Sequence, residues 1–140
     1  MFLSRGAFQF HEVCVQGYFM AGDIYTRADI PLDMHDYLMQ VSYSPEGLVG
    51  LLKKPQDRIK AVAPAVERLG GKVLGGGFCL GDYDVAVIVS LPNNEAVAAL
   101  SMAFGSGGTV RAVKTTPLLS GSEAVRAMKK ASQAGYKPAK

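Results

Sequence analysis

Three tyrosines, an aspartate and two cations could together bind a small ligand in this chain. Tyr83 and Asp84 stand side by side immediately before an apolar run, and Arg58 and Lys114 lie in segments expected to flank the same cleft. A carboxylate that enters an apolar strand is costly to bury unless it is paired. We therefore expect a cleft between helices and a sheet, where these groups bind a small polar or anionic ligand or position a substrate. Tyr37 and Tyr43 are candidates for lining the same cleft.

Each of these residues also has a structural interpretation. Asp84 could be a hairpin acid that accepts backbone N–H groups, or that pairs with Lys114 or Arg111. Tyr37 and Tyr43 could pack in the core, as amphipathic aromatic side chains commonly do. The sequence leaves both interpretations open.

The usual catalytic and metal-binding motifs are absent from the sequence. His11 and His35 form no HxH or HxxxH pair, so a structural zinc site is not expected. Cys14 and Cys79 make neither a CxxC motif nor a disulfide framework. No segment resembles a nucleophile elbow or a kinase loop. We predict no catalytic residue, no metal and no cofactor.

Two glycine-rich segments are not phosphate loops. Residues 75–77 lead into more strand pattern and lack the Lys-Ser/Thr pair of a P-loop, so they predict a β-bulge or a close backbone contact. Residues 105–108 follow a helix and precede a strand, which is the reverse of a phosphate cradle. They predict a helix end and a loop.

Composition limits the classes of partner. The chain has 140 residues, of which 49% are hydrophobic and 19% charged, with a formal net charge of +3. Much of the positive excess lies in the tail and is not interleaved with aromatic residues, so a nucleic-acid partner is not expected. No run approaches the roughly 18 apolar residues of a membrane helix, and the first residues lack the pattern of a signal peptide. We expect a cytoplasmic protein with no membrane partner.

The first half of the periodic region predicts a strand and two helices. Residues 37–43 alternate in polarity, as a half-buried strand does. Ser44-Pro45-Glu46 is typical of a helix start, and this short helix is expected to end near Lys54. Pro55 is expected to open a longer helix that contains Pro64 and ends at residues 70–71.

The second half predicts a hairpin, a helix, a strand and a last helix. Strands over 72–80 and 83–91 are joined by a tight turn at 81–82. A helix then runs from residues 92–95 to Gly105, and a strand covers 109–116. Ser120 and Glu123 form a capping box for a helix through about Ala131. We expect its apolar side chains, Val125 and Met128, to face inward.

This order predicts an α+β, ferredoxin-like βαββαβ fold over residues 34–140, with a four-stranded antiparallel sheet and an extra C-terminal helix. Right-handed crossovers place both main helices on one face of the sheet. The strand over 83–91 is apolar on both faces, through Ala86 and Ile88 on the second. A homodimer through the open sheet face is therefore expected.

Residues 1–33 show neither helical nor strand periodicity and contain several glycines. We interpret them as an extension of the domain or as the product of a mis-assigned start, because Met34 stands immediately before the first strand. The intact mass of the natively expressed protein tests this interpretation.

Five motifs together resemble a known family, the GYD-domain proteins. They are YSPE at 43–46, PQDR at 55–58, LGGK at 69–72, GDYD at 81–84 and KTTPLL at 114–119. The resemblance covers roughly residues 36–136 and implies a small bacterial domain with a ferredoxin-like fold, related in shape to dimeric α/β-barrel proteins. It implies no particular reaction.

Two classes of function follow. The first is a non-enzymatic homodimer with a binding, regulatory or stress-associated role. The second is a cofactor-poor enzyme of monooxygenase or isomerase type, which dimeric α/β barrels are able to host. A roomy pocket holding an activated carboxylate or tyrosine would favour the enzyme.

Overall fold

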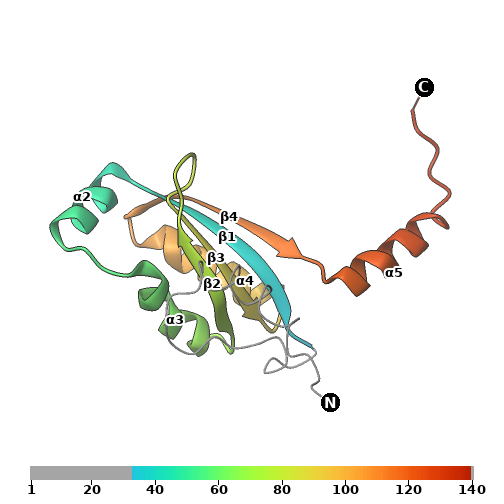
Figure 1. Cartoon of the computed structure of the whole chain (residues 1–140), viewed down its shortest axis with the longest axis horizontal. Coiled ribbons are helices and arrows are strands. Elements are labelled where there is room, and N and C mark those ends of the chain that lie inside the picture. Colours follow the sequence, from blue (N-terminus) through green and yellow to red (C-terminus); the bar gives the residue numbers. More distant parts are fainter. Residues whose placement is uncertain (1–32, 140) are drawn as a thin grey trace, which may run out of the picture.

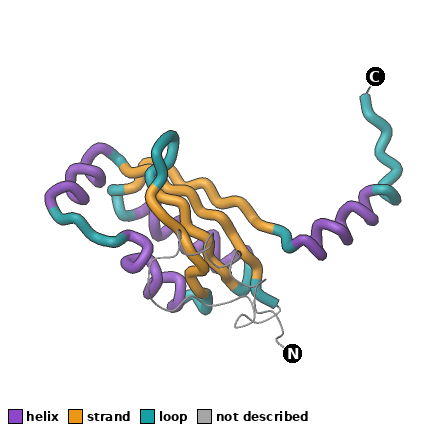
Figure 2. The backbone as a smooth tube through the Cα atoms, in the orientation of Figure 1, coloured by secondary structure: helices purple, strands orange, loops and turns teal. Residues whose placement is uncertain are grey.

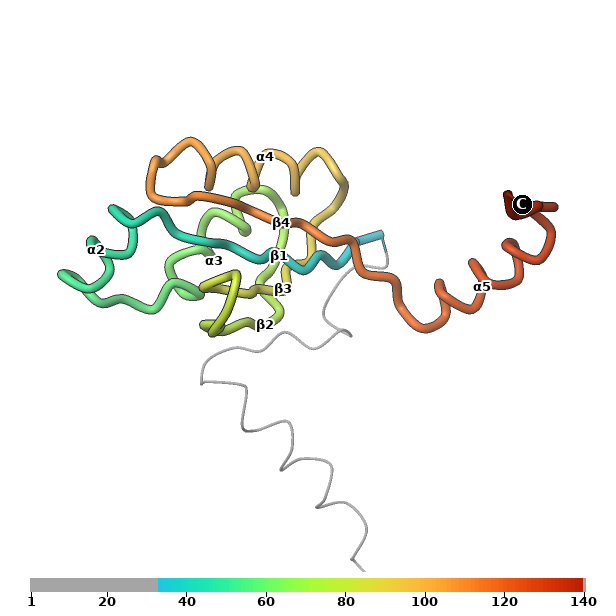
Figure 3. Tube along the Cα trace, turned by 90° about the horizontal axis from the view of Figure 1, so that it is seen from above, coloured from blue at the N-terminus to red at the C-terminus, as the bar shows by residue number. Residues whose placement is uncertain are grey.

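The computed structural model describes residues 33–139, which contain one antiparallel sheet and four helices. The strands are β1 (His35–Tyr43), β2 (Lys72–Phe78), β3 (Val85–Leu91) and β4 (Val110–Leu118). They lie in the order β2-β3-β1-β4, which Figure 3 shows. With a helix in each crossover, this arrangement confirms the predicted α+β, ferredoxin-like fold (Figure 1).

The helices are α2 (Pro45–Lys53), α3 (Arg58–Arg68), α4 (Asn94–Ser106) and α5 (Gly121–Ala131), coloured purple in Figure 2. Each begins after a side chain that accepts a hydrogen bond from the first turn: Ser44, Asp57, Asn93 and Ser120, respectively. Such caps satisfy backbone N–H groups that have no partner inside the helix.

The core lies between one face of the sheet and the helices α3 and α4. Strand register places Tyr37, Met39 and Val41 of β1 opposite Val89, Val87 and Val85 of β3. The helices contribute Val66, Val97 and Leu100, and all of these side chains are buried. Valine suits this position because its branched side chain packs well on a pleated surface.

Three predicted boundaries were wrong. Helix α3 begins at Arg58 and not at Pro55, because the Asp57 carboxylate caps the N–H groups of Ile59 and Lys60 at 3.0 and 3.2 Å. Strand β2 ends at Phe78 and strand β3 begins at Val85, so neither reaches the turn. The backbone of residue 84 is instead tied to β1, through its N–H to the Val41 carbonyl at 2.9 Å.

The glycine segments behave as structural elements. The register between β2 and β3 shifts between Val73 and Gly75, which confirms the predicted irregularity. A Cβ atom at Gly76 would lie 2.6 Å from the Ala86 carbonyl oxygen, so only glycine fits there. Helix α4 ends at Ser106, and Gly108 adopts a φ of 72° in the loop that follows.

Helix α5 contradicts one prediction. Val125 and Met128 are 50% and 70% exposed, and no residue of α5 is buried. Strand β4 runs on to Leu118, and α5 then continues beyond the end of the sheet, away from α3 and α4 (Figures 1 and 3). The helix forms where the sequence predicted it, but it does not fold back onto this domain.

The sheet face opposite α3 and α4 is mixed in polarity. Ala86 is half-buried and Ile88 is 37% exposed there, as the apolar pattern of β3 predicted. The neighbouring strands, however, contribute Gln40, Lys114 and Thr116 to the same face. The face is therefore less apolar than β3 alone suggested. The predicted extension over residues 1–33 lies outside the described residues, except for Asp33.

Candidate functional site

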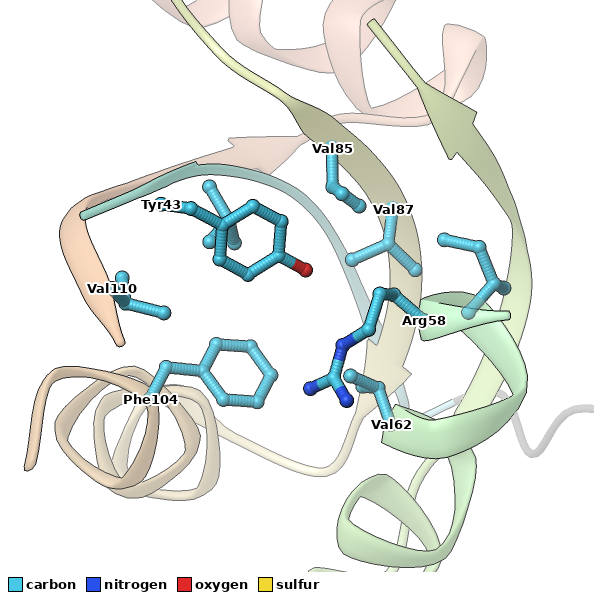
Figure 4. A pocket seen from close by; sticks show the side chains of 9 residues that line it. Tyr43, Arg58, Val62, Val85, Val87, Phe104 and Val110 are labelled. Carbon is cyan, nitrogen blue, oxygen red and sulfur yellow. The ribbon is translucent and has the colours of Figure 1, made fainter. Parts of the chain in front are cut away.

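A cleft opens between α3, α4 and the sheet, at the end where β1 finishes (Figure 4). Its volume of about 30 Å³ has room for about two water molecules. The lining is mainly apolar and comprises Val41, Tyr43, Arg58, Ile59, Val62, Val85, Val87, Phe104 and Val110.

Strand register and helix ends build this cleft. Val41 pairs with Val85, and Tyr43 pairs with Val110, so three strands bring their ends together on the helix-covered face. Phe104 comes from the last turns of α4 and Arg58 from the first turn of α3. The cleft thus lies where one helix ends and the other begins.

Arg58 is the only cationic side chain among the described residues that line the cleft. Its guanidinium points into the cleft, toward Tyr43 and Phe104 (Figure 4). The Nε atom is shut off from solvent and has no hydrogen-bond partner among the described residues. A buried donor without an acceptor is unfavourable by about 1–3 kcal/mol. A cation in the first turn also opposes the helix dipole.

Asp84 holds the backbone beside the cleft. Its Oδ2 atom accepts a hydrogen bond from the backbone N–H of Tyr43 at 2.7 Å. The Ser42 hydroxyl donates to the carbonyl of Asp82 at 2.7 Å. The structural interpretation of Asp84, as an acceptor of backbone N–H groups, is therefore confirmed. The loop that carries Gly81 to Asp84 fixes the end of β1, and hence the backbone that carries the Tyr43 ring.

The structure brings together two of the six candidate residues, Arg58 and Tyr43. Tyr37 is buried in the core, where its hydroxyl donates to Asn94 Oδ1 at 2.7 Å and burial raises its pKa. Tyr83 is half-buried in the loop before β3, outside the cleft lining.

The prediction that Lys114 lies at the cleft was wrong. Lys114 pairs with Gln40, and β1 directs Gln40 away from the helices because its neighbours Met39 and Val41 face them. Lys114 is therefore exposed on the opposite side of the sheet from the cleft. Phe104 was not among the predicted site residues. Its position directly before Gly105, in the last turn of α4, is the signal that could have placed it at the rim.

The sequence model described as the GYD domain matches residues 37–128. The chain belongs to the GYD-domain family. In this GYD domain, the GDYD motif at residues 81–84 is the loop that secures β1, so its role here is to position backbone. No curated protein sequence matches the chain.

The fold of this GYD domain is also similar to the crystal structure of MtbAldR, with a TM-score of 0.46 and 13% sequence identity. The match covers 78% of this chain and 66% of that chain, slightly under two thirds of its length. At this identity the similarity concerns fold alone.

The described part of this GYD domain contains neither a cluster of metal-binding side chains nor a helix that could span a membrane. Over residues 33–139, His, Cys, Asp and Glu side chains form no group of three or more that could hold a metal ion. In the same region, no helix is both long and apolar enough to cross a bilayer.

Proposed function

We propose that this GYD domain is a non-enzymatic homodimer that binds a small molecule in the cleft between α3, α4 and the sheet. The observation that carries the proposal is Arg58, a cation directed into an apolar cleft with a donor that has no acceptor among the described residues. Ligand sites are commonly concave and apolar, with a few polar groups that fix orientation.

The composition of the cleft favours binding over the alternative of an isomerase or monooxygenase. The described residues that line it provide a guanidinium and a phenol, and no carboxylate, imidazole or thiol. General acid–base catalysis near neutral pH depends most often on one of the latter groups. A regulatory or stress-associated role in the cytoplasm stays a prediction from the sequence.

Binding in the cleft can be tested by NMR with a fragment library. Valine methyl groups of the sheet, at positions 41, 85, 87 and 110, report directly on the cleft because they line it. We expect fragment-induced shifts to concentrate on these methyls. Shifts confined to the opposite sheet face, or the absence of any hit on the cleft methyls, would refute the proposed site.

The homodimer is supported by apolar surface that this domain leaves exposed. On the open sheet face, Ile88 and Leu118 are 37% and 38% exposed. On α5, none of whose residues is buried, Val125 and Met128 lie three residues apart on one side. Isolated helices of this length are marginal in water, so a second copy that covers α5 would stabilise it.

Sedimentation velocity over a wide range of protein concentration tests the dimer. We expect Ile88→Lys to shift the protein toward monomer, because it places a charge in the centre of the proposed interface. Met102→Lys on α4 is the matched control, since Met102 is 73% exposed on the helix side. A wild-type monomer at all concentrations, or equal dissociation by both variants, would contradict the homodimer.

A further inference from the structure

From the charge balance of the cleft, we propose that its ligand is a short-chain monocarboxylate with an apolar body. This inference rests on the function proposed above and adds the chemical class of the ligand. It follows from one cation, Arg58, in a lining that is otherwise valine, isoleucine, phenylalanine and one phenol.

One guanidinium balances one negative charge. Lys60, the nearest lysine in sequence, is exposed and pairs with Asp57 at 3.9 Å. Asp57 also caps α3, so both groups are engaged outside the cleft. A doubly charged phosphate would bring an uncompensated charge against apolar walls, which is strongly unfavourable. A monoanion is therefore preferred.

The guanidinium geometry favours a carboxylate in particular. Two parallel N–H donors of arginine match the two oxygens of a carboxylate. The Nε–H of Arg58 is one such donor, and it lacks an acceptor among the described residues. Because Nε is shut off from solvent, Arg58 must change rotamer, or a neighbouring ring must move, when the carboxylate binds. The hydroxyl of Tyr43 lies on the same side of the cleft and provides a further donor (Figure 4).

The apolar walls and the small volume define the remainder of the ligand. Val85 and Val87 are buried in the floor, and Phe104 forms one side. Methylene groups inserted between them would gain affinity by roughly fourfold each. Since the cleft has room for only about two water molecules, Arg58 or a neighbouring ring must move to admit even a short chain, and longer chains are disfavoured. Affinity is expected to rise from acetate to butyrate.

The experiment is an NMR titration with butyrate and with butyramide, its neutral isostere, at constant ionic strength. The Arg58 Nε–Hε signal and the cleft valine methyls are followed. We expect butyrate to bind at least tenfold more tightly than butyramide. Inorganic phosphate is the third probe and should bind more weakly than butyrate.

Two variants of α3 assign the charge recognition to one residue. Arg58→Gln should reduce butyrate affinity at least tenfold, and butyramide affinity by a clearly smaller factor. Arg68→Gln removes the same charge from the exposed end of the same helix and should change neither. If Arg58→Gln does not fold, the comparison of butyrate with butyramide on the wild-type protein still decides the proposal.

Each result has a distinct meaning. Equal affinities for butyrate and butyramide, measured at the cleft methyls, would overturn the proposal of a carboxylate ligand while leaving the binding site in place. Equal losses of butyrate affinity in the two variants would have the same meaning. If neither these probes nor the fragments shift the cleft methyls, the proposed function fails as well. Tighter binding of phosphate than of butyrate, at a pH where phosphate is mainly a dianion, would overturn the proposal that the ligand is a monoanion.

Discussion

Helices α3 and α5 have the same length and similar local signals, and they end in different environments. Each contains 11 residues, and each begins at a side-chain cap. Helix α3 packs on the sheet and buries Val66 completely, whereas α5 buries none of its residues. The comparison shows that local sequence specifies where a helix forms, while the path of the chain that leads into the helix specifies what it contacts.

The largest expected effect is the difference in the free energy of unfolding between a valine-to-alanine substitution in α3 and one in α5. Val66→Ala is expected to lower the free energy of unfolding by about 2 kcal/mol, because it leaves a cavity at a fully buried position. Val125→Ala, at a site that is 50% exposed, should change it by less than about 0.5 kcal/mol. Urea denaturation at low protein concentration measures both. Equal losses would show that α5 is packed in solution, and a loss that grows with concentration would assign that packing to a second copy.

Helix α2 offers an intermediate case, since it approaches the sheet through one glycine while Leu52 remains 74% exposed. A Cβ atom at Gly47 would clash with the Thr109 carbonyl oxygen, which also accepts a hydrogen bond from the Ser44 N–H. Gly47→Ala should therefore destabilise the domain by about 1–3 kcal/mol. Gly50→Ala meets no neighbour and should stabilise it by about 0.5–1 kcal/mol. Thermal unfolding of the pair measures the contrast, and a stabilising Gly47→Ala would contradict the close approach.

Removing the N-terminal cap should lower the stability of the whole domain when it is the cap of α3, and of the helix alone when it is the cap of α5. Asp57→Ala is expected to cost the whole domain about 1 kcal/mol, because α3 is part of the core. Ser120→Ala removes the capping box of α5, and its effect should be confined to that helix. Hydrogen exchange would then show faster exchange in α5 alone, with an unchanged denaturation midpoint. A lower midpoint for Ser120→Ala would mean that α5 contributes to the global fold.

The smallest expected effect is a pH dependence of α5. Hydrogen bonds from the Ser120 hydroxyl, and then from its backbone N–H, lower the pKa of Glu123. A lowered pKa means that the carboxylate stabilises the helix above its ordinary pKa of 4.5, and that this contribution is lost as pH falls through the lowered value. Amide shifts of α5 should therefore titrate below pH 4.5. Glu123→Gln should abolish that titration; its persistence would assign it to another group.

The sequence allowed most of the fold to be predicted. Alternating residues over 37–43, the caps at Ser44 and Ser120, and the break at residues 70–71 all mark elements that the structure contains. These signals act over a few residues, so they can be read locally. The boundary near Pro55 was wrong because proline and the Asp57 cap are both compatible with a helix start, and only the hydrogen bonds of Asp57 decide between them.

The candidate site was predicted less completely, because it depends on contacts between distant segments. Arg58 and Tyr43 do meet in the cleft, but Lys114 points the other way. A shift of one residue in strand register moves a side chain to the opposite face, and the sequence of β4 does not by itself fix its register against β1. Of the two interpretations of Asp84 that the sequence left open, the structure contains the hydrogen bond from a backbone N–H, and its donor, Tyr43, lies 41 positions away.

The sequence by itself determined the kinds of element, their order and the apolar face of the central strands, because propensity, capping and alternation are properties of neighbouring residues. Only the tertiary structure decided that Arg58 faces apolar walls without an acceptor among the described residues. It also decided that α5 extends from the domain with none of its residues buried. Both outcomes depend on how separate segments pack, and packing joins residues whose separation along the chain carries no local signal.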